Sequence, residues 1–146
     1  MASADTLAEN ERLVQEMTPA IWGADGSPEA IDDYFASDVV AHEPGETIRG
    51  REGYKAMERG LREAMPDLDG EVEFTVCQDD LVAAYYRATG THTGELWGIP
   101  PTGESGEVTG IAVYRIEDDR VVECWHEFDK FGMFQQLGLV PEFGEE

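Results

Sequence analysis

Asp129 is the residue whose position in this sequence most strongly suggests chemistry. It follows residues 120–128, an apolar and aromatic-rich run typical of a strand, and precedes residues 130–137, which have the pattern of a short amphipathic helix. A carboxylate beside apolar side chains costs free energy unless it has a hydrogen-bonding or chemical role. Two roles fit Asp129: it caps the helix that follows, or it serves as general base and general acid in an apolar pocket.

The three histidines are the next candidates, and each has two interpretations. His42 either reaches the mouth of a pocket or makes only a local hydrogen bond in its loop. His92, near the end of a predicted strand, either lines a pocket or caps the following loop. Trp125 and His126 are consecutive in a predicted strand, so their side chains should point to opposite faces. Trp125 should share a strand face with Asp129, where it is either a wall of the pocket or a core residue. His126 should point to the opposite face, where it belongs to a packed face or to a subunit contact.

Neither a metal nor a cofactor is expected. The histidines lack the spacing of a metal site, and the sequence contains no Gly-x-Ser-x-Gly motif and no glycine-rich phosphate loop. Cys77 and Cys124 lie within predicted strands, without a Cys-x-x-Cys pair, so we expect reduced, buried thiols.

The apolar periodicity predicts helices first and a sheet afterwards. Helices are expected at residues 5–22, 27–37 and 51–65, and a short extended segment at 39–42. Beyond residue 70 the period changes to two. Strands are then expected at 72–76, 81–93, 107–117 and 120–128, with a loop at 94–106 and a last helix at 130–137.

This order of elements predicts one α+β domain over residues 1–146, since it does not alternate strand and helix as parallel sheets require. A curved antiparallel sheet wrapped by the N-terminal helices would form a cone that encloses an apolar pocket. Tyr54 and Trp97 are among the aromatic residues available to line it.

The charge of the chain is strongly one-sided. Asp and Glu number 32 against 10 Lys and Arg, for a net charge of −22, and only Lys55 and Lys130 are lysines. Such a surface repels itself in dilute salt and is screened in molar salt, so we expect a halophilic protein; an ordinary acidic protein is the alternative. Nucleic acid and anionic membranes are unsuitable partners. No run approaches about 18 apolar residues, and we expect a cytoplasmic protein.

Several short motifs, in this order, resemble the SnoaL-like polyketide cyclase family of the NTF2-like superfamily. They are His42-Glu-Pro44, Ile48-Arg-Gly-Arg-Glu-Gly53, Met65-Pro-Asp67, His92-Thr-Gly94, Gly98-Ile-Pro-Pro-Thr-Gly103, Arg120-Val-Val-Glu-Cys-Trp125, Asp129 and Gln135-Gln-Leu-Gly138. The resemblance covers about residues 10–140 and implies an NTF2-like cone with an enclosed pocket. It also implies intramolecular aldol ring closure without metal or cofactor, by one acid at the position of Asp129.

We therefore expect a cyclase or isomerase that acts on a small hydrophobic carbonyl compound, with Asp129 as base and acid. The expected substrate-binding residues are His42, Tyr54, His92, Trp97 and Trp125. A non-catalytic binding module remains an alternative. So does an epoxide or ester hydrolase, which would require Glu127 and either Arg87 or Arg115 to turn inward.

A homodimer is also expected. The strand at residues 120–128 should present Val122, Cys124 and Phe128 on the outer face of the sheet, where apolar side chains need cover.

Overall fold

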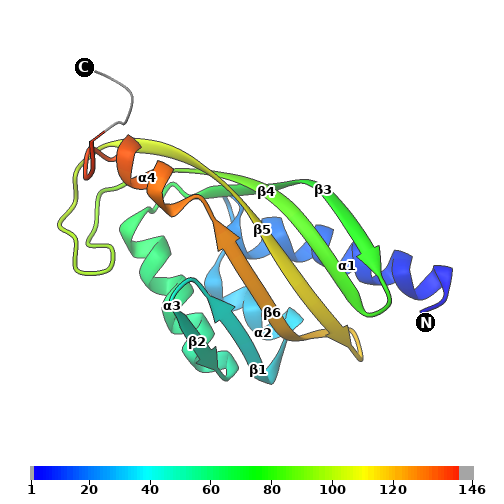
Figure 1. Cartoon of the computed structure of the whole chain (residues 1–146). Coiled ribbons are helices and arrows are strands. Elements are labelled where there is room, and N and C mark those ends of the chain that lie inside the picture. The colour runs from blue at the N-terminus through cyan, green and yellow to red at the C-terminus, as the bar shows by residue number, and fades with distance from the viewer. Residues whose placement is uncertain (1, 142–146) are drawn as a thin grey trace.

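A strongly curved sheet of six strands forms the centre of the molecule (Figure 1), whose computed structural model describes residues 2–141. The strands are β1 (Phe35–Glu43), β2 (Glu46–Arg49), β3 (Asp69–Gln78), β4 (Leu81–Thr91), β5 (Ser105–Glu117) and β6 (Arg120–Phe128). Their order across the sheet is β2-β1-β6-β5-β4-β3. β1 and β6 run parallel, and every other neighbouring pair is antiparallel.

Helices cover one face of this sheet and one end of it (Figure 1). They are α1 (Ala4–Trp22), the 3₁₀ turn η1 (Pro28–Ala30), α2 (Ile31–Tyr34), α3 (Arg51–Ala64) and α4 (Lys130–Gln136). α1 packs against β3 and β4, α3 against β1, and α4 against β5. None of the described helices combines the length and the apolar character needed to cross a membrane.

The predicted α+β architecture is confirmed, with two local corrections. The spacing of Ile31, Tyr34 and Phe35 predicts a helix as far as residue 37, but the helix ends at Tyr34 and Phe35 begins a strand. Phe35 and Val39 are four positions apart, so strand alternation puts both on the same, buried face, and the pairing with β6 is irregular between Phe35 and Val40. The sheet is also mixed, because β1 pairs with β6 in parallel and the short strand β2 extends its edge.

Two apolar clusters hold the helices on the sheet. The first includes Val14, Met17 and Ile21 of α1, which pack beside Phe35 and Val82. The second lies under α4 and the loop before β5, and includes Met65, Leu68, Leu96, Met133 and Leu137.

The cysteines are free, as expected. Cys124 is buried, and Cys77 is partly exposed with its thiol 3.5 Å from Glu11 Oε2.

Candidate active site

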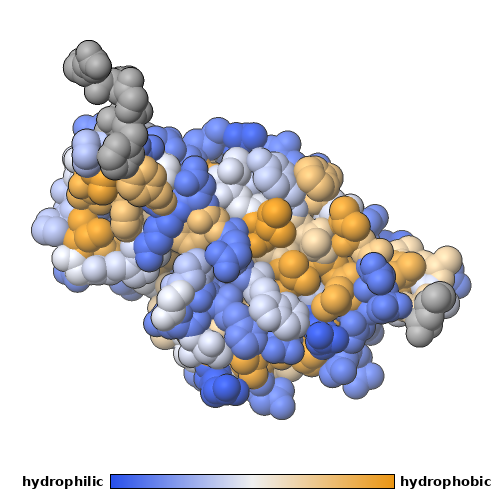
Figure 2. Space-filling view, in the orientation of Figure 1, coloured by the Kyte–Doolittle hydropathy of each residue, from blue (hydrophilic) through white to orange (hydrophobic). Residues whose placement is uncertain are grey.

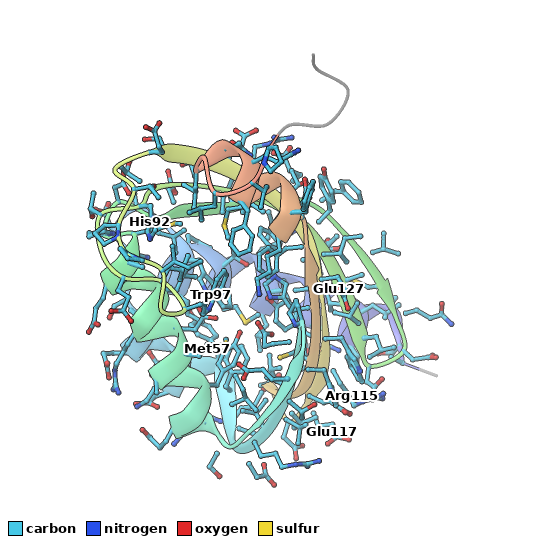
Figure 3. All side chains as sticks on the ribbon, turned by 60° about the vertical axis from the view of Figure 1, so that its left-hand side comes forward. Met57, His92, Trp97, Arg115, Glu117 and Glu127 are labelled. Atoms are coloured by element: carbon cyan, nitrogen blue, oxygen red, sulfur yellow. The ribbon has the colours of Figure 1, made fainter. Side chains whose placement is uncertain are left out.

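A cavity of about 150 Å³ lies between α3 and the concave face of the sheet. Its walls are mostly apolar, with Met57 and Leu61 from α3, Ala84 and Ala88 from β4, and Phe128 from β6. Figure 3 shows Met57 and Trp97 in the space between α3 and the sheet. A second hollow of about 200 Å³ shares Met57, Trp97 and Phe128 with the cavity and forms its mouth.

Polar groups are few in the lining, and three of them form one hydrogen-bonded chain. Nδ1 of His126 is 3.0 Å from Glu43 Oε1, and Nε2 of His126 is 2.5 Å from the Tyr86 hydroxyl. The three residues come from β6, β1 and β4. The parallel register aligns His42 with Trp125, so the next residues, Glu43 and His126, are also neighbours. The pairing of β1 with β6 therefore builds the chain.

Glu58 is the second acidic group of the cavity, and it comes from α3. It lies four residues after Tyr54, on the buried face of the helix. The Trp22 indole donates a hydrogen bond of 2.7 Å to Glu58 Oε2, while Oε1 has no partner among the described residues. Burial raises the pKa of the Glu58 carboxyl to about 7, although the bond from Trp22 lowers it.

These groups act on one another electrostatically. The charge of Glu43 raises the pKa of Glu58, and the charge of His126 lowers it. Burial, followed by the charges of Glu58 and Glu43, raises the pKa of Tyr86. A carboxyl whose pKa lies near neutrality, beside a histidine and a phenol in an apolar cavity, is suited to moving protons at carbon and oxygen atoms.

Asp129 lies outside this cavity. Its side chain is exposed, and Oδ1 accepts a hydrogen bond of 2.9 Å from the backbone amide of Gly132. The helix-capping geometry considered from the sequence is therefore present at the start of α4. The catalytic role of Asp129 stays a prediction, without a contact that places its carboxylate in the cavity.

Three of the five expected substrate-binding residues border the cavity: Tyr54, Trp97 and Trp125. Tyr54 is buried, and Trp97 is half-exposed at the mouth. The ring of Trp125 stacks on His42, with 5.5 Å between ring centres, and lies under the guanidinium of Arg115. Trp125 thus places its ring against residues outside the lining.

His42 and His92 lie away from the cavity lining. His42 Nε2 is 2.7 Å from Glu123 Oε2. His92 is fully buried, and its Nδ1 accepts a hydrogen bond of 3.2 Å from the Thr102 amide. Neither position gives support to a substrate-binding role.

The expected facing of β6 was wrong. Cys124, His126 and Phe128 line the cavity instead of facing outward. Alternation separates two sets of side chains but does not say which is inside. The set with Glu123 and Glu127 lies outside, where carboxylates keep their contact with water.

The arginines considered for a hydrolase also face outward. Arg115 Nη1 is 3.1 Å from Asp80, and Arg87 pairs with Glu73 at 3.0 Å and with Glu107. Figure 3 shows Arg115 and Glu127 on the side of the sheet away from α3. Among the described lining residues there are two carboxyls and no arginine, so the hydrolase alternative lacks its arginine.

Comparisons with known proteins find structures of the same overall fold. AclR from Streptomyces galilaeus, suggested to be a hydroxylase, is 27% identical with a TM-score of 0.82, over 93% of this chain and 89% of that chain. IdmH from Streptomyces antibioticus, suggested to be a polyketide cyclase, is 31% identical with a TM-score of 0.66, over 92% of this chain and 97% of that chain. A protein from Catenulispora acidiphila with a ketosteroid isomerase-like fold is 17% identical with a TM-score of 0.73, over 88% and 93% of the two chains, and shows the shared fold alone.

A search of curated proteins found no match. The sequence profile of the SnoaL-like polyketide cyclases, in contrast, matches residues 12–137, which is most of the chain. The predicted NTF2-like cone is confirmed by the structural neighbours. The chain therefore belongs to the SnoaL-like polyketide cyclase family.

Proposed function

We propose that this protein is a cofactor-free cyclase or isomerase that moves protons on a small hydrophobic carbonyl compound, in an aldol-type ring closure. The observation that carries the proposal is the apolar cavity with Glu58 on one wall and the Glu43–His126–Tyr86 chain on another. Apolar walls fit a hydrophobic substrate, and the two polar groups supply a base and an acid.

Glu58 is the proposed base. Its free atom Oε1 removes a proton from the carbon beside a carbonyl, and the electron pair of the C–H bond moves into the carbonyl to form an enolate. Because the pKa of Glu58 is about 7, its carboxylate is a stronger base than that of an exposed glutamate, and enough of it is ionised at neutral pH.

Tyr86 is the proposed acid. With Glu43 as a carboxylate, Nδ1 of His126 carries a proton and donates it toward Glu43. A protonated Nε2 would then donate to the Tyr86 oxygen and free the phenol proton for the alkoxide formed on ring closure. The chain from Glu43 through His126 orients the phenol and replaces its proton.

The test uses β-tetralone, a bicyclic hydrophobic ketone, as a probe of proton removal. In deuterium oxide the wild-type protein should speed the entry of deuterium beside the carbonyl, measured by NMR. Glu58→Gln keeps the acceptor oxygen for Trp22 but loses the base, so exchange should fall by about 10²–10⁴-fold.

Glu63→Gln is the matched control, because Glu63 is an exposed glutamate of the same helix. It should exchange at the wild-type rate. Exchange unchanged in Glu58→Gln would contradict the assignment of the base. Tight binding of the ketone without any exchange by the wild-type protein would instead favour the alternative of a non-catalytic binding module.

We also propose that the protein works in concentrated salt solution and that it assembles as a homodimer. The acidic excess of the chain supports the first point. For the second, Phe74, Val76 and Ile111 are large apolar residues that stay exposed. Figure 2 shows hydrophobic patches over the sheet, interrupted by hydrophilic residues. These three residues replace the outward Cys124 and Phe128 expected from the sequence.

A further inference from the structure

Two tyrosines of the cavity are held in place by the same buried ring. Tyr54 of α3 stacks on Phe35 with ring centres 4.9 Å apart. Tyr114 of β5 meets Phe35 edge to face, with ring centres 6.4 Å apart. Phe35 itself is completely buried. One anchor therefore fixes two phenol rings that reach the cavity from α3 and from the sheet.

Neither phenol hydroxyl of this pair has a hydrogen-bond partner among the described residues. This distinguishes them from Tyr86, whose hydroxyl is bonded to His126. Tyr54 is only 4% exposed and Tyr114 only 6%. Some buried polar atoms of the described residues have no partner and no accessible surface, but neither tyrosine oxygen is one of them. Each hydroxyl therefore keeps some accessible surface, and we infer that it faces the cavity that its residue lines. A buried hydroxyl without a partner costs free energy, and a ligand oxygen would satisfy it.

Tyr54 and Tyr114 line the same cavity as the proposed base Glu58 and the proposed acid Tyr86. Burial is the main cause that raises the pKa of both tyrosines. Charges on neighbouring groups raise the pKa further: those of Glu58 and Cys124 for Tyr54, and those of Cys124 and Tyr86 for Tyr114. The two phenols thus stay protonated at neutral pH and are available as donors. A neutral donor fixed in an apolar space is the kind of group that stabilises charge developing on oxygen.

We propose that Tyr54 and Tyr114 form a paired donor site that binds the carbonyl oxygen of the substrate and stabilises its enolate. This assignment rests on the proposed function and adds its substrate requirement: a ketone whose oxygen sits between the phenols while the neighbouring carbon faces Glu58.

The step is balanced within these residues. The C–H bond breaks, the proton passes to Glu58 Oε1, and the electron pair leaves a negative charge on the carbonyl oxygen. The negative charge of the Glu58 carboxylate therefore moves to the enolate oxygen, which the two phenol O–H groups hydrogen-bond. No other reactant is consumed.

The experiment measures the carbonyl stretching frequency of isotope-labelled β-tetralone bound to the protein. A ketone only accepts hydrogen bonds, so its frequency reports the donors that face it. In the wild-type protein the frequency should lie below its value in an apolar solvent. Tyr54→Phe and Tyr114→Phe should each remove part of this shift, and the double variant should remove it. Each single variant should also weaken ketone binding by about three- to tenfold.

Tyr85→Phe is the control, because the ring of Tyr85 stacks on the exposed Phe74, at a centre distance of 5.2 Å. It should leave the shift unchanged. The phenylalanine variants should melt no lower than wild type, since they remove a hydroxyl without a protein partner. An unshifted frequency in the wild type, no ketone binding, or a shift that the double variant keeps would overturn the donor site. The donor site would also be overturned if Tyr86→Phe lost the shift while the Tyr54 and Tyr114 variants kept it.

These outcomes are separate from those of the exchange test. A shift lost in the double variant, together with no deuterium exchange, would leave the donor site in place and remove the proposed catalytic function. Deuterium exchange by a wild-type protein that does not shift the carbonyl frequency would support the proposed catalytic function and overturn the donor site.

Discussion

Glu58 is a carboxyl whose ionisation is opposed by folding, since its pKa rises from 4.5 to about 7 when it is buried. In this pH range the folded protein binds more protons than the unfolded chain. The contribution of Glu58 to the free energy of unfolding is therefore largest below pH 4.5. It decreases as the pH rises from 4.5 and is lost as the pH passes through about 7. The loss amounts to about 3 kcal/mol.

Glu58→Gln should remove that dependence, because a glutamine does not titrate. Denaturant unfolding at several pH values between about 5 and 8 measures it. Wild type should lose stability relative to the variant as the pH rises. Parallel curves for the two proteins would show that the Glu58 carboxyl does not titrate across this range.

Single residues were predicted unevenly from the sequence. Tyr54 and Trp97 were expected at the cavity and line it. For Tyr54 the signal was its helical spacing with Met57 and Leu61, which puts the three side chains on one face of α3. Glu58 was missed because a glutamate in an amphipathic helix is normally a solvent-facing residue. Its spacing of four from Tyr54 was the available signal. Glu43 was missed as a site residue because its contact with His126 spans 83 positions of the chain.

At the scale of elements, β5 depends on Gly110 to leave space for the hydrogen bond of Tyr86. A Cβ atom at this position would lie 2.6 Å from the Tyr86 hydroxyl and 2.8 Å from the Glu127 carbonyl oxygen. Gly110→Ala should displace Tyr86 from His126, lower stability by about 1–3 kcal/mol and reduce ketone exchange. Thermal melting and the deuterium assay measure the two effects.

Gly60→Ala provides the contrast for this substitution. Gly60 lies within α3, and nothing approaches the position of its missing Cβ within 4 Å. The same added methyl group should there stabilise the protein by about 0.5–1 kcal/mol. If Gly110→Ala behaved like Gly60→Ala, Gly110 would not be required for the packing around Tyr86.

The helices α1, α3 and α4 and most of the strands followed from local periodicity, since a single apolar face determines each of them. β2 and the parallel pairing of β1 with β6 did not. β2 has only four residues, with no alternation in its burial. Strand pairing is a contact between distant segments of the chain, and local periodicity does not predict which segments pair. That unpredicted pairing is the one that brings Glu43 to His126.

At the scale of the whole molecule, the net charge of −22 governs how stability depends on salt. Repulsion among exposed carboxylates is nearly unscreened in dilute buffer, and in molar salt the screening length falls to about 3 Å. The melting temperature should therefore rise from low to molar KCl. Equal melting temperatures in both solutions would contradict a halophilic protein.

The outer face of the sheet should carry the dimer. Sedimentation in molar KCl should give a homodimer for the wild type and a monomer for Ile111→Lys, because Ile111 is one of the exposed apolar residues there. A wild-type monomer under these conditions would remove the proposed assembly.

We propose that the chemistry takes place at Glu58 inside the cavity and not at Asp129 on the surface. Glu58→Gln and Asp129→Asn test it as a pair, since asparagine is also a good helix cap and should keep α4 in place. The measurement is the rate at which each protein closes an achiral triketone to its bicyclic enone by intramolecular aldol reaction. We predict a loss of about 10²–10⁴-fold for Glu58→Gln and a nearly unchanged rate for Asp129→Asn. The opposite pattern would contradict this account and support the catalytic role predicted for Asp129 from the sequence.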